Sequence, residues 1–140
     1  MIYFKAVSRK NPITKAEKWY PQLVSGAPMQ LNDIVERISR TCTVTEHDVK
    51  AVVSSLQEQV IFALREGRSV RLGDLGSFRL TLAGEGTDTA DELKAAHISH
   101  LRVRFSRSGR LRSDLRIGNS SIRFSKMADT GETGGLDPEE

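Results

Sequence analysis

The sequence lacks any long hydrophobic run. No stretch of about 18 consecutive apolar residues occurs, so a membrane-spanning helix is excluded. The first residues also lack the basic and then apolar order of a signal peptide, and we therefore expect a cytoplasmic protein. Cys42 is the single cysteine, which excludes an internal disulfide and agrees with a reducing compartment. We expect Cys42 to be a small buried residue beside a helix end rather than a nucleophile.

Groups that could carry catalysis or hold a metal are scarce. The three histidines, the one cysteine and the scattered acids show no spacing typical of a metal site. No combination of serine, acid and histidine indicates nucleophilic catalysis. Several glycines lack the spacing and the following Lys-Ser/Thr of a phosphate loop, and are interpreted as turn residues: Gly73, Gly76, Gly84 and Gly86. We therefore expect no enzymatic activity, no metal, no cofactor and no small-molecule substrate.

The net charge of +3 conceals a strong asymmetry. Residues 100–126 contain eight lysines and arginines and a single acid, Asp114. Residues 1–20 contain five lysines and arginines and a single acid, Glu17. Residues 127–140 instead hold five acids and no base, which predicts a disordered acidic tail. The basic excess of the rest indicates a polyanionic partner. We expect the tail to compete for that basic surface, so that its deletion should raise affinity at low salt.

The first half of the chain is predicted to form strands and then helices. Alternation predicts a strand at Ile2–Arg9 and a short extended segment at Trp19–Val24, within an N-terminal extension of residues 1–28. Apolar residues at helical spacing predict a helix beginning near Leu31. Thr45 is a suitable N-cap for a second, longer helix that reaches about Glu66.

The segment Ser69–Gly84 carries the clearest pattern. Two alternating runs flank the turn Gly73–Gly76, which is typical of a β-hairpin. The segment Ile98–Phe105 alternates in the same way and predicts a third strand. Between them, Glu85–Ala96 reads as an acidic loop with a short helical turn capped by Asp88. A short helix at about Ser108–Arg116 and a last strand at Ser120–Ser125 complete the expected elements.

Strand alternation sends the apolar residues of this sheet to one face and its arginines to the other. The arginine positions are Arg71, Arg79, Arg102 and Arg104, and Arg107, Arg110 and Arg112 continue the charge into the last helix. A solvated sheet face would ordinarily mix Lys, Glu, Thr and Ser. Arginine makes forked contacts to phosphates, so the pattern predicts DNA binding that is largely independent of sequence and sensitive to salt.

The motif Val70-x-Leu72-x-x-Leu75-Gly76-x-Phe78 follows two predicted helices and precedes a strand ending at Phe105. Over about residues 30–115 this arrangement resembles the bacterial histone-like HU and integration host factor family. Arg9–Pro12 and Arg68–Phe78 resemble the longer HU-like proteins of Bacteroidetes. The resemblance implies an α+β, HU-like domain over residues 29–126, with two helices, a three-stranded antiparallel sheet and a short C-terminal helix. It also implies an obligate, intertwined homodimer that lies as a saddle over double-stranded DNA.

Members of that family carry long arms with a proline at each tip, which wedges between base pairs. In this sequence the arm region, residues 83–97, is short and acidic, and no proline occurs between Pro28 and Pro138. We therefore expect an architectural protein of the bacterial nucleoid that coats or gently bends duplex DNA. The alternative is an HU-fold dimerisation or protein-interaction module that has lost strong DNA binding, which the acidic arm and the N-terminal strands favour.

Overall fold

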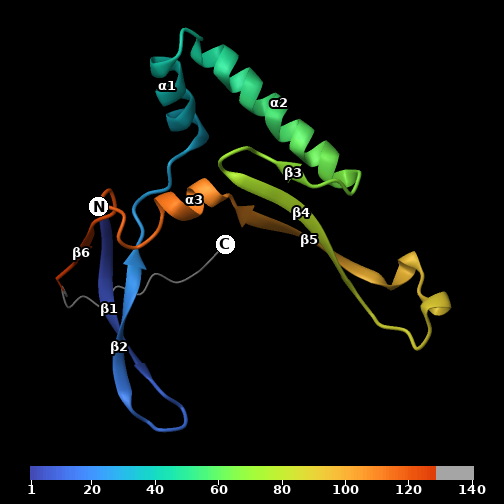
Figure 1. Cartoon of the computed structure of the whole chain (residues 1–140), viewed down its shortest axis with the longest axis horizontal. Coiled ribbons are helices and arrows are strands. Elements are labelled where there is room, and N and C mark those ends of the chain that lie inside the picture. The colour runs from blue at the N-terminus through green and yellow to red at the C-terminus, as the bar shows by residue number, and fades with distance from the viewer. Residues whose placement is uncertain (129–140) are drawn as a thin grey trace. The chain divides into compact units, whose positions relative to one another are not determined.

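The computed structural model describes residues 1–128 and has an α+β fold with three α-helices and two three-stranded sheets (Figure 1). The described residues divide into two compact units, Met29–Arg116 and a second one that combines Met1–Pro28 with residues 117–128. The acidic tail predicted over residues 127–140 lies, from residue 129, outside the described residues. Within residues 1–128, no helix is both long enough and apolar enough to cross a membrane.

The N-terminal unit is built on a β-hairpin. Strand β1 (Ile2–Lys10) pairs antiparallel with β2 (Glu17–Val24) along their whole length, from Tyr3 opposite Val24 to Lys10 opposite Glu17. Both predicted extended segments are confirmed, and the second begins two residues earlier than expected. Strand β2 contains Pro21, which the sheet tolerates because β2 lies at its edge.

A third strand, β6 (Phe124–Lys126), completes this sheet by pairing in parallel with β1. The Ile2 amide donates to the Arg123 carbonyl at 2.7 Å, and the Met127 amide donates to the Phe4 carbonyl at 2.9 Å. The sequence placed residues 117–126 in the same domain as the arginine-bearing strands. In the structure, residues 117–126 group by their contacts with Met1–Pro28, and the extent of the HU-like domain stays a prediction.

The unit Met29–Arg116 begins with helices α1 (Leu31–Thr41) and α2 (Glu46–Arg65). Thr45 caps α2 as predicted, because its Oγ1 accepts from the Asp48 amide at 3.3 Å. Gly67 has φ 71°, and the amides of Gly67 and Arg68 donate to Leu64 and Ala63 at 3.0 and 2.9 Å. This is the Schellman ending, which requires a residue that tolerates the left-handed conformation.

The second sheet has the order β3 (Val70–Arg71), β4 (Gly76–Gly84) and β5 (Ile98–Arg107), all antiparallel. Strands β4 and β5 run side by side as a long ribbon, and α3 (Gly109–Asp114) follows β5 directly (Figure 1). The predicted hairpin, third strand and short helix are confirmed.

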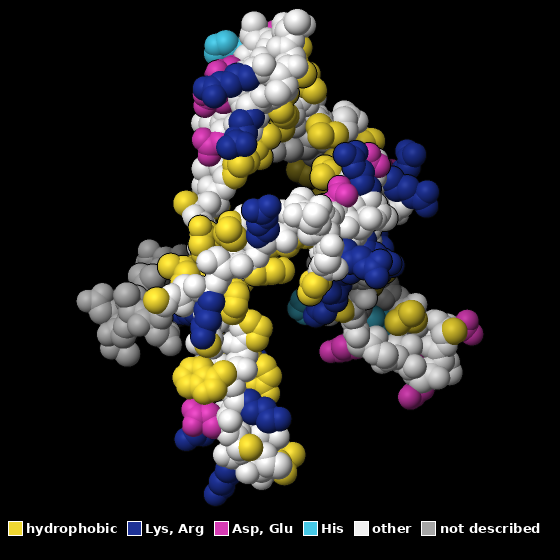
Figure 2. Space-filling view, turned by 60° about the vertical axis from the view of Figure 1, so that its left-hand side comes forward, with side chains coloured by type: hydrophobic (Ala, Val, Ile, Leu, Met, Phe, Trp, Pro, Cys, Tyr) yellow, Lys and Arg dark blue, Asp and Glu magenta, His cyan; other side chains and the backbone are white. Residues whose placement is uncertain are grey.

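The single chain buries very little. Among the described residues, the buried hydrophobic side chains are those of Val35, Val49 and Leu64. On β5, Leu101, Val103 and Phe105 are 65%, 57% and 51% exposed. Hydrophobic side chains lie open on the surface in the space-filling view (Figure 2). An exposed apolar strand face of this kind is typical of an interaction surface.

One local expectation is wrong, and a second is confirmed only in part. Cys42 follows α1 as predicted but is exposed, because the whole connection from Thr41 to Val44 lies at the surface of the chain. The short helical turn expected after Asp88 is present, but as two separate 3-10 turns, Ala90–Glu92 and Ala95–His97. The extended backbone between the two turns interrupts any longer helix, and Thr89 rather than Asp88 precedes the first turn.

Candidate nucleic-acid interface

The turn between β3 and β4 sets the shape of the second sheet. The Leu72 amide donates to the Gly76 carbonyl at 2.8 Å, and the Leu75 amide donates to the Leu72 carbonyl at 3.1 Å. Gly76 has φ 154°, and a Cβ placed on it would lie 2.2 Å from the backbone oxygen of Ser106. Glycine at position 76 therefore lets the start of β4 approach β5 closely.

The strand register brings four of the predicted arginines to one face. Arg79 lies opposite Arg104, Thr81 opposite Arg102, and Arg71 opposite Ser77. Residues directly paired across antiparallel strands share a face of the sheet. We call the resulting surface the arginine face; it consists of Arg71, Arg79, Arg102 and Arg104, with Ser77, Thr81, His100 and Ser106 between and beside them.

The other face of the same sheet is apolar. Phe78 lies opposite Phe105, Leu80 opposite Val103, and Leu82 opposite Leu101. The rings of Phe78 and Phe105 have centroids 5.1 Å apart and planes inclined at 52°, a favourable tilted arrangement.

The arginine face is electrostatically unbalanced. All four arginines are exposed, and β3, β4 and β5 contain no Asp or Glu at all. Like charges directly opposite each other destabilise a sheet, and Arg79 and Arg104 occupy such a pair. A bound anion between them would relieve this repulsion.

Arg107 does not join the arginine face. It lies opposite Gly76, so it has the same strand parity as Phe105 and belongs to the apolar side at the end of β5. The sequence alone could have shown this, because the alternation of β5, continued for two residues beyond Phe105, assigns Arg107 to the apolar side.

Arg110 is engaged within the protein. Its Nη1 lies 2.8 Å from Asp74 Oδ2, and its Nε lies 3.6 Å from Asp114 Oδ2. The hydrogen bond and the charge of Asp74, followed by the charge of Asp114, raise the pKa of the Arg110 guanidinium above its ordinary value. Sequence spacing could not reveal this pair, because Asp74 lies in the turn before β4, far from α3 along the chain.

Helix α3 is fixed to the same turn by Ser108. The Ser108 amide donates to the Leu75 carbonyl at 3.0 Å, and its Oγ accepts from the Leu111 amide at 3.0 Å as the N-cap. Arg112 on this helix is exposed and makes no ion pair with any of residues 1–128. Arg107, Arg110 and Arg112 are predicted from the sequence to extend the basic surface past the sheet. Of the two on α3, Arg112 is the one whose charge is not paired within residues 1–128.

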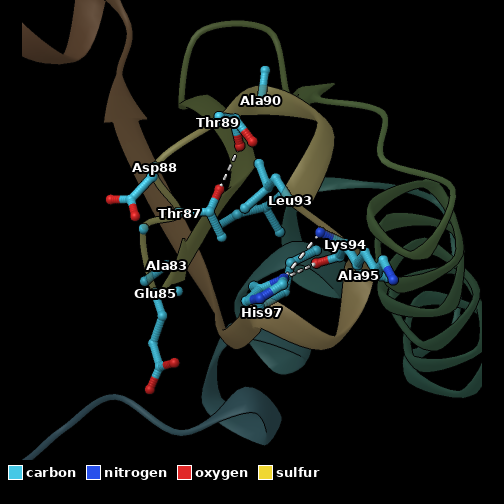
Figure 3. Close-up of a pocket in the computed structure, with 14 residues that line it drawn as sticks. Ala83, Glu85, Thr87, Asp88, Thr89, Ala90, Leu93, Lys94, Ala95 and His97 are labelled. Atoms are coloured by element: carbon cyan, nitrogen blue, oxygen red, sulfur yellow. Dashed lines mark hydrogen bonds between the residues drawn. The ribbon is translucent and has the colours of Figure 1, made fainter.

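The β4–β5 ribbon ends in a compact cap rather than an extended tip. A register shift occurs between Ala83 and Gly84, and the Glu85 amide donates to the His97 carbonyl at 3.1 Å. A cavity of about 800 Å³ lies within the cap, lined by residues between Leu82 and Ile98. Leu93 points into this space, whereas Glu85 and Asp88 point away from it (Figure 3). Within residues 1–128, no group of acids, histidines or cysteine is placed to hold a metal ion.

Similar folds occur among solved structures. A protein from Bacteroides vulgatus ATCC 8482, described as a candidate bacterial DNA-binding protein, superposes with a TM-score of 0.62 at 18% identity. The match covers 89% of this chain and 48% of that protein, so the chain spans about half the length of that relative. A mutant of HU from Thermotoga maritima matches with a TM-score of 0.47 at 16% identity, covering 63% of this chain and 100% of that one. No curated protein matches the sequence.

A family model also matches this sequence. It describes an HU domain fused to a wHTH, Ig or glycine-rich motif, and it matches residues 1–123. The matched range includes all three α-helices and every described strand except β6. The chain therefore belongs to the HU-HIG family.

Proposed function

We propose that this protein is a histone-like architectural protein that binds duplex DNA with little sequence preference, as a homodimer, through its arginine face. The observation that carries the proposal is the set of four exposed arginines, Arg71, Arg79, Arg102 and Arg104, on one side of a sheet without an acidic residue. Membership of a family defined by an HU domain supports it.

The chemistry of this face fits phosphate rather than bases. Guanidinium groups make forked, charge-assisted hydrogen bonds to phosphate oxygens and keep their charge at all physiological pH values. Contacts to the phosphate backbone position a protein on DNA but do not read its sequence. Binding through them releases counterions, so affinity falls steeply as salt rises.

The apolar side of the second sheet supports dimerisation. Leu101, Val103 and Phe105 are each more than half exposed in the single chain. We infer that a second copy covers them, as the intertwined HU-like dimer expected from the sequence would do. Such a dimer would present two arginine faces to one duplex, in the bacterial nucleoid.

The shape and charge of the arm favour coating or gentle bending of the duplex DNA over sharp kinking. Proteins that kink DNA insert an apolar wedge between base steps. Here the ribbon closes into two 3-10 turns, and the segment from Ala83 to His97 contains four acids, one lysine and no proline. Acidic groups at this end would be repelled by phosphates.

The test is a salt titration of binding to a random-sequence duplex, measured by fluorescence anisotropy. We compare the wild type with an Arg102→Ala/Arg104→Ala variant and with an Arg37→Ala/Lys50→Ala control, which removes the same charge from exposed positions on α1 and α2. Because the proposed dimer presents two arginine faces to the duplex, the double variant loses four phosphate contacts, and the slope of log affinity against log salt should fall by about 3.6. An unchanged slope, or no binding by the wild type at low salt, would contradict the proposal.

The second candidate function is a dimeric interaction module without DNA binding. The observation that favours it is the cavity in the arm cap, into which Leu93 points, while Glu85 and Asp88 point outward from it (Figure 3). A dimer that fails to bind the duplex at low salt in the same titration would support this candidate.

A further inference from the structure

We propose that the N-terminal unit carries a second DNA-contacting surface, formed by Lys5, Arg9 and Lys18 with Tyr3 and Tyr20 on one face of the β1–β2 hairpin. This inference rests on the proposed function and adds a separate site to it, on a part of the chain that does not include the arginine face.

The register of the hairpin places these residues together. Tyr3 lies opposite Val24, Lys5 opposite Gln22, Val7 opposite Tyr20, and Arg9 opposite Lys18. The Arg9 Cζ lies 5.9 Å from the centroid of the Tyr20 ring, which agrees with a shared face and holds the guanidinium over it. We call this surface the N-terminal basic face.

The opposite face differs sharply in character. Phe4 lies opposite Leu23 and Ala6 opposite Pro21, and parallel pairing with β6 adds Phe124 beside Ile2. The one acid of residues 1–28, Glu17, also belongs to this other face: it lies opposite Lys10, and its carboxylate accepts a hydrogen bond from Ser8 Oγ. The N-terminal basic face therefore contains cations and no carboxylate.

The side chains of this face are available and suited to phosphate. Tyr3 and Tyr20 are 47% and 45% exposed, and Lys5, Arg9 and Lys18 are exposed as well. Lysine, arginine and the tyrosine hydroxyl are all donors that proteins use toward phosphate oxygens. Lys5 and Arg9 are four residues apart on one strand, or roughly 13 Å. About four phosphates of one DNA strand lie along such a length of duplex.

The experiment uses the full chain and pairs of substitutions within the same sheet. Lys5→Gln/Lys18→Gln removes two cations from the N-terminal basic face. Lys10→Gln/Lys126→Gln removes two cations from the opposite face, since Lys10 pairs with Glu17 and Lys126 pairs with Phe4. Lys5→Arg/Lys18→Arg keeps the charge. Each is titrated with salt against the same random duplex, and circular dichroism checks the fold.

We expect Lys5→Gln/Lys18→Gln to reduce the salt slope by about 1.8 for each protomer whose N-terminal basic face contacts the duplex. We expect Lys10→Gln/Lys126→Gln and Lys5→Arg/Lys18→Arg to bind like the wild type. Equal binding by the two glutamine pairs would overturn the inference. If Lys5→Gln/Lys18→Gln fails to fold, the single variants Lys5→Gln and Lys18→Gln should each reduce the slope by about 0.9 for each protomer in contact with the duplex, and unchanged slopes would overturn the inference equally.

The two proposals fail in different ways. If the wild type does not bind duplex DNA at low salt, the proposed function fails. If the wild type binds and Arg102→Ala/Arg104→Ala weakens it, while Lys5→Gln/Lys18→Gln matches its control, only the second surface is disproved. If both surfaces contact DNA independently, their losses in log affinity should add when the two double variants are combined.

Discussion

Arg79 and Arg104 lie directly opposite each other on neighbouring strands, with no acidic residue anywhere in the sheet to separate their charges. A sheet selected for stability alone would place an opposite charge or a threonine at one of these positions. The arrangement costs the free protein some stability and is suited to holding a phosphate.

The first prediction follows from this pair. Arg104→Thr should raise the free energy of unfolding by up to about 0.5 kcal/mol, because it removes a like-charge pair and introduces a β-branched residue. The same variant should bind duplex DNA more weakly. Urea unfolding at one fixed protein concentration and anisotropy titration measure the two effects. A variant that is less stable than the wild type would show that the arginines do not repel each other.

The second prediction concerns the turn. Gly76→Ala should destabilise the protein by about 1–3 kcal/mol, the usual range for overpacking. The added Cβ would meet the Ser106 backbone oxygen at 2.2 Å and the Phe105 ring at 2.8 Å. Gly109→Ala is the matched control, because nothing lies within 4 Å of a Cβ at position 109. Chemical unfolding of both variants tests this, and equal midpoints would contradict it.

The third prediction separates two arginines on α3. Arg110 is neutralised by Asp74 and Asp114, whereas Arg112 has no such partner among residues 1–128. Arg112→Gln should therefore reduce DNA affinity and its salt slope more than Arg110→Gln. Asp74→Asn should release Arg110 and raise affinity at low salt. An Arg110→Gln variant that loses more affinity than Arg112→Gln would show that the ion pair opens when DNA binds.

The fourth prediction tests the apolar side of the second sheet. Sedimentation of the wild type should show a dimer, and Val103→Asp should shift it toward monomer because a carboxylate would be buried without a partner. Thr81→Asp is the control on the arginine face; it should leave the dimer intact while weakening DNA binding. A wild-type protein that sediments as a monomer would contradict the proposed dimer.

Much of the fold could be predicted from local sequence signals. Thr45 and Gly67 mark the two ends of α2 because the capping of each end depends on a few neighbouring residues. The alternation of Phe78 with Arg79, and of Arg104 with Phe105, places their side chains on opposite faces once the segments are strands. These signals depend only on neighbouring residues, and the structure confirms the elements that they predict.

What the sequence could not show depends on contacts between distant residues. The pairing of Arg110 with Asp74 requires α3 to lie against the turn before β4, and no local pattern encodes that approach. The exposure of Cys42 depends on which segments cover the end of α1. The division of the arm cap into two 3-10 turns escaped prediction because turns such as Ala90–Glu92 are too short to show a helical period.

The parallel pairing of β1 with β6 has a consequence for how the protein is made. During synthesis the hairpin of β1 and β2 leaves the ribosome first, yet its third strand follows only after the whole unit Met29–Arg116 has been translated. Pairing of Ile2 with Phe124 closes a loop of more than a hundred residues, a slow and entropically costly step. We therefore expect the unit Met29–Arg116, which is inserted in the sequence between the two parts of the other unit, to complete its folding first.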